Sequence, residues 1–227
     1  MSFYQDLENR TQSGRAYLLS APIIQRCLRG DVTLPEYVAF LQQAYHHVKH
    51  TVPLLMATGA RLPESKEWLR EATAEYIEEE LGHQEWILND IEACGFSKEQ
   101  ARTRQPNAAT ELMVAYAYDM VNRVNPLGFF GMVHVLEGTS INIASLAADK
   151  IQAALGLPNQ AFSYLHSHGK LDIKHVAFFE SLMNRIDDRA EQDLIVHSAN
   201  RFYRLYGNIF HELGETPQHN NAWELAS

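Results

Sequence analysis

Apolar residues recur with the spacing of an α-helix along almost the whole chain, and this pattern excludes most fold classes. Leu7, Leu18, Ile24 and Leu28 fall at helix-compatible spacings, and Gly30 ends that run. We find no segment that reads convincingly as a strand. We therefore expect helices at about residues 3–28, 34–60, 64–94, 98–102, 108–124, 127–155, 159–186 and 188–213. Long helices with short connections predict an all-α bundle of about seven helices.

Local signals set the expected helix boundaries. Thr33 and Glu36 form a capping box, and Pro35 between them suits a first helical turn. Pro53 is expected to bend the helix that follows. Asp187 or Asp188 is expected to cap the last helix.

Length and composition are consistent with one domain. The 227 residues are 46% hydrophobic, which is enough to build one large core. We expect a single domain over residues 1–213 and a mobile tail over 214–227. The formal net charge of −9 gives no electrostatic basis for binding nucleic acid or an anionic membrane, so we expect neither as a partner.

The cysteine content and the hydropathy pattern indicate a cytoplasmic protein. Cys27 and Cys94 form no spacing motif, and so few cysteines argue for a reducing compartment. The first residues, Met-Ser-Phe-Tyr-Gln-Asp-Leu-Glu, do not resemble a signal peptide. No stretch approaches the roughly 18 consecutive apolar residues that a membrane helix needs.

The first candidate metal-binding motif is His168-x-x-x-Asp172-x-x-His175. On a helix of about 3.6 residues per turn these three side chains lie on one stripe. Burying them is costly unless they are satisfied, and neutral imidazole suits iron, zinc and copper. The alternative is an exposed polar face, which Lys170 and Lys174 would favour.

The second motif is Glu80-x-x-His83, a pair that ferritin-like carboxylate proteins use to place two ligands on one helical face. Glu79 precedes His83 by four residues and is a credible substitute for Glu80. The alternative is a solvated acidic face, because this spacing is common by chance.

A third candidate is Glu137, a single acidic residue inside a largely apolar helix. Lone charges in such surroundings are rarely without a partner. A metal ion would satisfy the carboxylate, and so would a hydrogen bond from a buried Tyr or Ser.

A histidine cluster, His46, His47 and His50, lies upstream of Pro53. His46 and His50 share one helical face, and His47 points elsewhere. A surface cluster would explain at least two of the three, and one that faces the core would be a candidate ligand. Without this cluster, the three motifs together supply three carboxylates and three histidines on three helices, the inventory of a dinuclear carboxylate-bridged metal centre.

The order of these motifs resembles that of the haem-oxygenase-like diiron oxidases and oxygenases. This family belongs to the superfamily of the TenA thiaminases and the cofactorless PqqC oxidase. The resemblance covers roughly residues 15–213. It implies a haem-oxygenase-like fold and two non-haem irons, with manganese as a second candidate metal. The ligands that it implies are Glu80, His83, Glu137, His168, Asp172 and His175, with Glu79, His46 and His47 as candidate extra ligands.

The resemblance also implies oxygen-dependent oxidation of a small molecule such as an amino acid, a fatty acid or an aromatic metabolite. Some relatives carry a further glutamate on the helix before the E-x-x-H helix. Here that stretch reads Tyr45-His46-His47, so this ligand is absent or replaced by histidine.

Two alternative functions stay open. One is a TenA- or PqqC-like metal-free enzyme that acts on an organic ligand. Against a TenA-like enzyme, no cysteine has surroundings that would activate it as a nucleophile. Against a PqqC-like enzyme, cofactorless chemistry would give the carboxylate of H-x-x-x-D-x-x-H no evident role. The other is a metal-binding helical protein without turnover. Haem oxygenase itself needs an N-terminal proximal histidine, and no histidine precedes His46.

The expected partners follow from the diiron interpretation. They are dioxygen, a small-molecule substrate and a candidate external electron donor. We expect a homodimer, because closed two-fold dimers are the commonest soluble oligomers. The candidate walls of the substrate pocket are Tyr45, Phe129, Phe130, Met132 and Phe178.

Overall fold

The fold is all-α, as the hydrophobic periodicity predicts. The computed structural model describes the backbone of residues 1–215 and their side chains, except those of Asn142, residues 168–174 and Glu215. Within this part of the chain there is no β-strand. The α-helices are α1 (Phe3–Arg10), α2 (Gln12–Leu19), α3 (Pro22–Leu28), α4 (Leu34–Val48), α5 (Thr51–Arg61), α6 (Glu67–Glu80), α7 (His83–Ala93), α8 (Lys98–Thr103), α9 (Ala108–Asp119), α10 (Phe129–Leu155), α11 (Ser163–Met183) and α12 (Arg189–Glu215).

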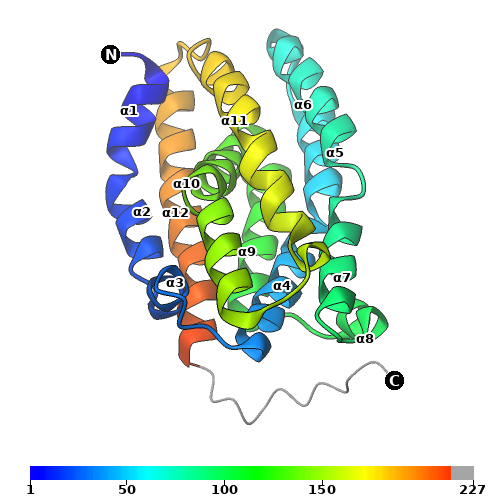
Figure 1. The fold of residues 1–227 in the computed structure, drawn as a ribbon. Coiled ribbons are helices and arrows are strands. Elements are labelled where there is room, and N and C mark those ends of the chain that lie inside the picture. The colour runs from blue at the N-terminus through cyan, green and yellow to red at the C-terminus, as the bar shows by residue number, and fades with distance from the viewer. Residues whose placement is uncertain (216–227) are drawn as a thin grey trace.

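Short elements join several of these helices. They are η1 (Glu64–Lys66), the π-helical turn η2 (Met120–Val124), η3 (Pro126–Gly128) and η4 (Asn159–Phe162). Figure 1 shows α10 in the middle of the bundle, with α1, α2 and α3 on the side of α12 and with α5, α6 and α7 on the opposite side. Helix α10 packs against α11 and α12, and α4 packs against α7. None of the helices within residues 1–215 combines the length and the hydropathy needed to span a bilayer.

Three of the predicted helices are divided, so residues 1–215 contain twelve α-helices rather than about seven. The predicted helix 3–28 is three helices, interrupted at Thr11 and before Pro22. The predicted helix 34–60 stops at Val48, and a new helix starts at Thr51. Pro53 offers no N–H to the carbonyl group of residue 49, so the helical ladder cannot run through this point.

The predicted helix 64–94 is also divided. Gly82 has φ = 91°, a left-handed conformation that interrupts a right-handed helix. Helix α6 therefore ends at Glu80 and α7 begins at His83. The expectation that Glu80 and His83 share one face of a continuous helix is wrong.

Other boundary predictions are confirmed. The Thr33 hydroxyl accepts from the backbone N–H of Glu36, and the Glu36 carboxylate accepts from the backbone N–H of Thr33. Asp188 accepts from the backbone N–H groups of Ala190 and Glu191 at the start of α12. Helix α12 extends through Glu215, so the predicted tail starts inside a helix, and its remainder lies outside the described residues.

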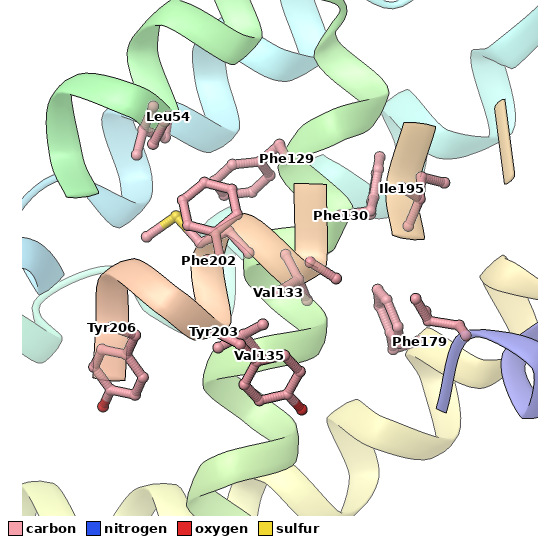
Figure 2. Close-up of a cluster of buried hydrophobic side chains, with 14 of the residues drawn as sticks. Leu54, Phe129, Phe130, Val133, Val135, Phe179, Ile195, Phe202, Tyr203 and Tyr206 are labelled. Atoms are coloured by element: carbon pink, nitrogen blue, oxygen red, sulfur yellow. The ribbon is translucent and has the colours of Figure 1, made fainter. Parts of the chain in front are cut away.

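Buried aromatic and aliphatic side chains from α5, α10, α11 and α12 fill much of the bundle interior. Phe129, Phe130, Phe179 and Phe202 are each at most 3% exposed, and Figure 2 shows them gathered between these helices. Gly131 lets α10 and α12 approach closely, because a Cβ atom there would lie 2.6 Å from the backbone N of Ala199.

A buried carboxylate joins α7 to the start of α11. The Asp90 side chain is fully buried. It accepts hydrogen bonds from the backbone N–H groups of Ser163 and Tyr164, at 3.1 Å and 2.9 Å, and from the Ser163 hydroxyl. These donors are the first backbone groups of α11, so Asp90 caps that helix from a distance of more than 70 residues in sequence. Helix α11 continues without a break through Gly169.

Replacing Asp90 with asparagine should change how stability depends on pH. Burial raises the pKa of Asp90 to about 6, although the hydrogen bonds from Ser163 and Tyr164 oppose the rise. Because this pKa lies above that of the unfolded chain, ionisation of Asp90 costs stability as the pH rises from about 4 to about 6. The difference in free energy of unfolding between the wild type and Asp90→Asn, measured with urea, should therefore decrease across this pH range. The expected decrease is on the order of 2 kcal/mol. An advantage that is constant across the window would contradict this assignment.

Candidate functional site

A small cavity lies between α4, α5, α6, α10, α11 and α12. Its volume is about 90 Å³. Three of its lining residues can bind a metal, namely His47 of α4, Glu80 of α6 and Glu137 of α10. The other lining residues are Val48, Thr51, Leu55, Tyr76, Phe129, Met132, Val133, Leu136, Ser140, Tyr164 and Tyr206. Two carboxylates from different helices therefore face one largely apolar space.

Glu80 and His83 pair across the break between α6 and α7. The Glu80 Oε2 atom lies 3.0 Å from Nδ1 of His83, within hydrogen-bond distance. The His83 side chain is 3% exposed, and its ring stacks on Trp86 at 4.0 Å between centroids. The turn at Gly82 brings the two side chains together. Glu80 and His83 are therefore neighbours, as predicted, although they do not lie on one continuous helix.

Glu137 and His175 form a second pair, between α10 and α11. Oε1 of Glu137 lies 3.7 Å from Nδ1 of His175, and the two side chains are 13% and 4% exposed. Nε2 of the same imidazole lies 2.7 Å from Oε2 of Glu79. The edge of the His175 ring also contacts Tyr76, at 5.8 Å between ring centroids. Glu79, His175 and Glu137 thus form one polar chain from the end of α6 to the middle of α10.

The structure places four of the six predicted ligands, as the pairs Glu80–His83 and Glu137–His175. The other two, His168 and Asp172, lie outside the described side chains, although their backbone belongs to α11. Among the described side chains, no three His, Cys, Asp or Glu residues lie close enough together to form a complete metal site.

The donors that are present suit a hard or borderline divalent metal ion. Carboxylate oxygen and imidazole nitrogen are the ligands that iron and manganese take in proteins. Two donors of one metal lie about 3 Å apart when each bond is about 2.1 Å long. The separation of 3.7 Å between Glu137 and His175 is close to this value. Glu80 and Glu137, which line the cavity, and the histidines beside them therefore suit a metal centre by the chemistry of their donor atoms.

Only one member of the upstream histidine cluster faces the cavity. His47 lines it, next to Tyr206. His46 is buried but turned away, with Nε2 2.7 Å from the amide nitrogen of Gln42 and Nδ1 3.3 Å from Nζ of Lys49. His50 contacts the Tyr118 hydroxyl at 3.1 Å.

The residues expected to form a substrate pocket have different surroundings. Phe129 and Met132 line the cavity. Phe130 is fully buried in the core, and Phe178 packs against Tyr76. Tyr45 packs against His46 and Lys49, beside the histidine that is turned away from the cavity.

Several residues that shape the site carry no recognisable sequence signal. Tyr76, Ser140, Tyr164 and Tyr206 have no pattern that would separate them from ordinary core residues. Asp90 did have a signal, because it stands among apolar Ile87, Leu88 and Ile91 in the same way as Glu137 stands in α10. A single acidic residue among apolar helical residues is thus the sequence signal that marks Asp90.

The environment of His46 predicts a loss of stability in acid. Burial lowers the pKa of His46 to about 4, and the nearby charge of Lys49 adds to this effect. Because this pKa lies below that of an unfolded histidine, the neutral His46 stabilises the fold above about pH 6.5, and this stabilisation is lost as the pH falls towards 4. Chemical unfolding of wild type and His46→Gln should therefore show the wild-type advantage decreasing from pH 7 to pH 4. A difference in free energy of unfolding between the two proteins that stays constant from pH 7 to pH 4 would contradict this prediction.

Solved structures with the same fold include a domain of unknown function, a TenA homologue and a haem oxygenase. A domain of unknown function with a haem-oxygenase-like fold from Shewanella denitrificans OS217 is 22% identical, with a TM-score of 0.84 and coverage of 94% of this chain and 92% of that chain. A TenA homologue from Pseudomonas syringae pv. tomato DC3000 is 12% identical, with a TM-score of 0.77 and coverage of 93% and 92%. Haem oxygenase-1 from Synechocystis sp. PCC6803, solved with haem, is 14% identical, with a TM-score of 0.74 and coverage of 94% and 92%.

These similarities show that the chain has the haem-oxygenase-like fold expected from its motifs. No curated protein matches the chain at a significant level. A family model described as "iron-containing redox enzyme" matches residues 38–207, which include all six predicted metal ligands. The chain belongs to this family of iron-containing redox enzymes.

Proposed function

We propose that this protein is a non-haem diiron oxidoreductase that uses dioxygen to oxidise a small-molecule substrate. The observation that carries this proposal is the convergence of Glu80 and Glu137 on one cavity, each with a buried histidine beside it. Carboxylates that meet from separate helices inside an apolar bundle are characteristic of dinuclear carboxylate centres. Membership of an iron-containing redox family supports the same metal.

We assign the iron ligands to Glu80, His83, Glu137 and His175, together with two further residues of α11. His168 and Asp172 precede His175 by seven and three residues, which places all three on the same stripe of that helix. Bound iron would supply the redox chemistry that activates dioxygen, which no side chain of the protein can supply. Two members of this proposed set, Glu80 and Glu137, line the cavity.

The remaining residues of the cavity orient ligands and exclude water. Oε2 of Glu79 is close enough to Nε2 of His175 to hold a proton on that nitrogen. The lone pair of Nδ1 then points towards Glu137 and is available to a metal. Phe129, Met132 and Leu136 form apolar walls that keep bulk water from the reacting atoms. A small organic substrate, dioxygen and an external electron donor complete the proposed reaction.

Anaerobic titration with ferrous iron, followed by exposure to oxygen with a reductant present, tests this function. We expect about two irons to bind per chain and oxygen to be consumed by the loaded protein. Glu137→Ala should reduce both the iron content and the rate of oxygen consumption, the rate by more than about tenfold. Glu78→Ala is the matched control, because Glu78 is an exposed residue near the end of α6.

Each negative result points to a different alternative. A protein that binds no iron would be a metal-free enzyme of the TenA type. One that binds iron without consuming oxygen would be a passive metal-binding protein. Unchanged iron binding in Glu137→Ala would show that the metal lies elsewhere.

A second prediction concerns Glu79 as an orienting residue. Glu79→Ala should weaken ferrous iron binding about 10- to 100-fold, which is the usual effect of removing a carboxylate that orients a metal-binding histidine. Glu79→Gln should lose less, because it keeps a polar oxygen of the same length of side chain beside Nε2 of His175. The affinity is measured by competition with a chelator, with Glu78→Ala as the control. Equal affinities in Glu79→Ala and Glu78→Ala would remove Glu79 from the site.

A further inference from the structure

A second cavity lies next to the candidate metal centre and is almost entirely apolar. Its volume is about 100 Å³. It lies between α3, α4, α10, α11 and α12, and side chains such as Ile24, Phe40, Ile143 and Ala147 line it. None of the predicted metal ligands whose side chains are described belongs to its lining.

The two cavities share three lining residues, Ser140, Tyr164 and Tyr206. Ser140 lies on α10, one helical turn after Glu137, and Tyr164 lies at the start of α11. Figure 2 shows Tyr206 of α12 at the edge of the buried cluster, apart from Phe130 and Ile195. The apolar cavity therefore lies directly beside the space that Glu80 and Glu137 face, with these three side chains at the boundary between them.

The two neighbouring cavities together have the volume of a small organic molecule. An engineered apolar cavity of about 150 Å³ binds benzene. Each cavity here is smaller than this, and the two together are larger. A flexible chain that lies in the apolar cavity can place its head at the shared side chains, beside the other cavity.

A hydroxyl group at the junction provides one polar contact. Oγ of Ser140 is buried and has no hydrogen-bond partner among the described residues. An unsatisfied buried hydroxyl is costly, and a polar group of a ligand at this point would satisfy it.

The charges around the two cavities favour an uncharged ligand. Among the described residues, neither cavity is lined by lysine or arginine. Glu36, at the edge of the apolar cavity, already pairs with Arg26 and with the N-terminus of α4. Burial raises the pKa of the Cys27 thiol to about 11, so this lining residue is also neutral. In the described part of the chain, an anionic head would thus have no lysine or arginine beside it.

From these observations we propose the class of substrate. This inference rests on the proposed function, which makes the two cavities a substrate site. It is an alkyl-chain compound with one uncharged polar head. The chain lies in the apolar cavity, and the head lies at Ser140, on the side of Glu137.

The test uses calorimetry to measure how tightly metal-free protein binds straight-chain 1-alkanols, from 1-butanol to 1-decanol. Affinity should rise about fourfold for each added methylene group, because burying a CH₂ contributes about 0.8 kcal/mol, until the cavity is filled. Ala147→Phe fills the cavity and should weaken 1-octanol binding at least about tenfold. The matched control is Leu146→Phe, an exposed position on the same helix, which should leave binding unchanged. Absence of binding, or equal effects of the two variants, would overturn the proposed chain site.

Two further measurements test the head group. Ser140→Ala should weaken 1-octanol binding about 2- to 10-fold, whereas Ser145→Ala at an exposed position of α10 should not. Equal affinities in these variants would overturn the placement of the head. 1-Octanol should also bind more tightly than octanoate, both to metal-free protein and after anaerobic loading with ferrous iron. Tighter binding of octanoate in either state would show that the head is charged.

These experiments separate this inference from the diiron proposal. Binding to metal-free protein depends on neither iron nor oxygen. Alkanol binding with the expected variant pattern, in a protein that takes up no iron, would support the chain site and refute the diiron function. Iron uptake and oxygen consumption without alkanol binding would support the diiron function and refute the chain site.

Discussion

Glu137 and His175 lie inside an apolar helix bundle, and the cost of burying them dominates the chemistry of this protein. A carboxylate and an imidazole in such surroundings need partners that compensate for lost hydration. The structure supplies some of this compensation by bringing Glu79 to one nitrogen of His175 and Glu137 to the other. A bound metal ion would also compensate for lost hydration, because it satisfies several oxygen and nitrogen donors at once. The same dry environment that makes the donors costly would protect a reactive metal centre from water.

The backbone around the site is organised so that four helices, α6, α7, α10 and α11, meet there. The left-handed turn at Gly82 ends α6 at Glu80 and starts α7 at His83. Asp90 then ties α7 to the first turn of α11, the helix that carries His175. Gly131 allows α10 to pack closely on α12, upstream of Glu137. A few local features therefore hold donors that are distant in sequence near one cavity.

The sequence was informative about chemistry and less informative about helix geometry. Lone charged residues in apolar helices, such as Glu137, could be recognised because burial of a charge needs an explanation. Helix breaks were missed where periodicity continued across them, as at Gly82 and between α4 and α5. The pairing of Glu79 with His175 and the cavity junction at Ser140 could not be predicted, because they depend on how α6, α10, α11 and α12 pack in space.

The central claim is that iron binds between α6, α7, α10 and α11, and crystallography of anaerobically iron-loaded protein tests it most directly. Anomalous diffraction at the iron absorption edge should show two peaks about 3.5–4 Å apart. Glu80 and His83 should contact the centre from one side, and Glu137 and His175 from the other. Iron bound instead at the His46 and His50 side of α4, or at the protein surface with Glu137 uninvolved, would contradict this account.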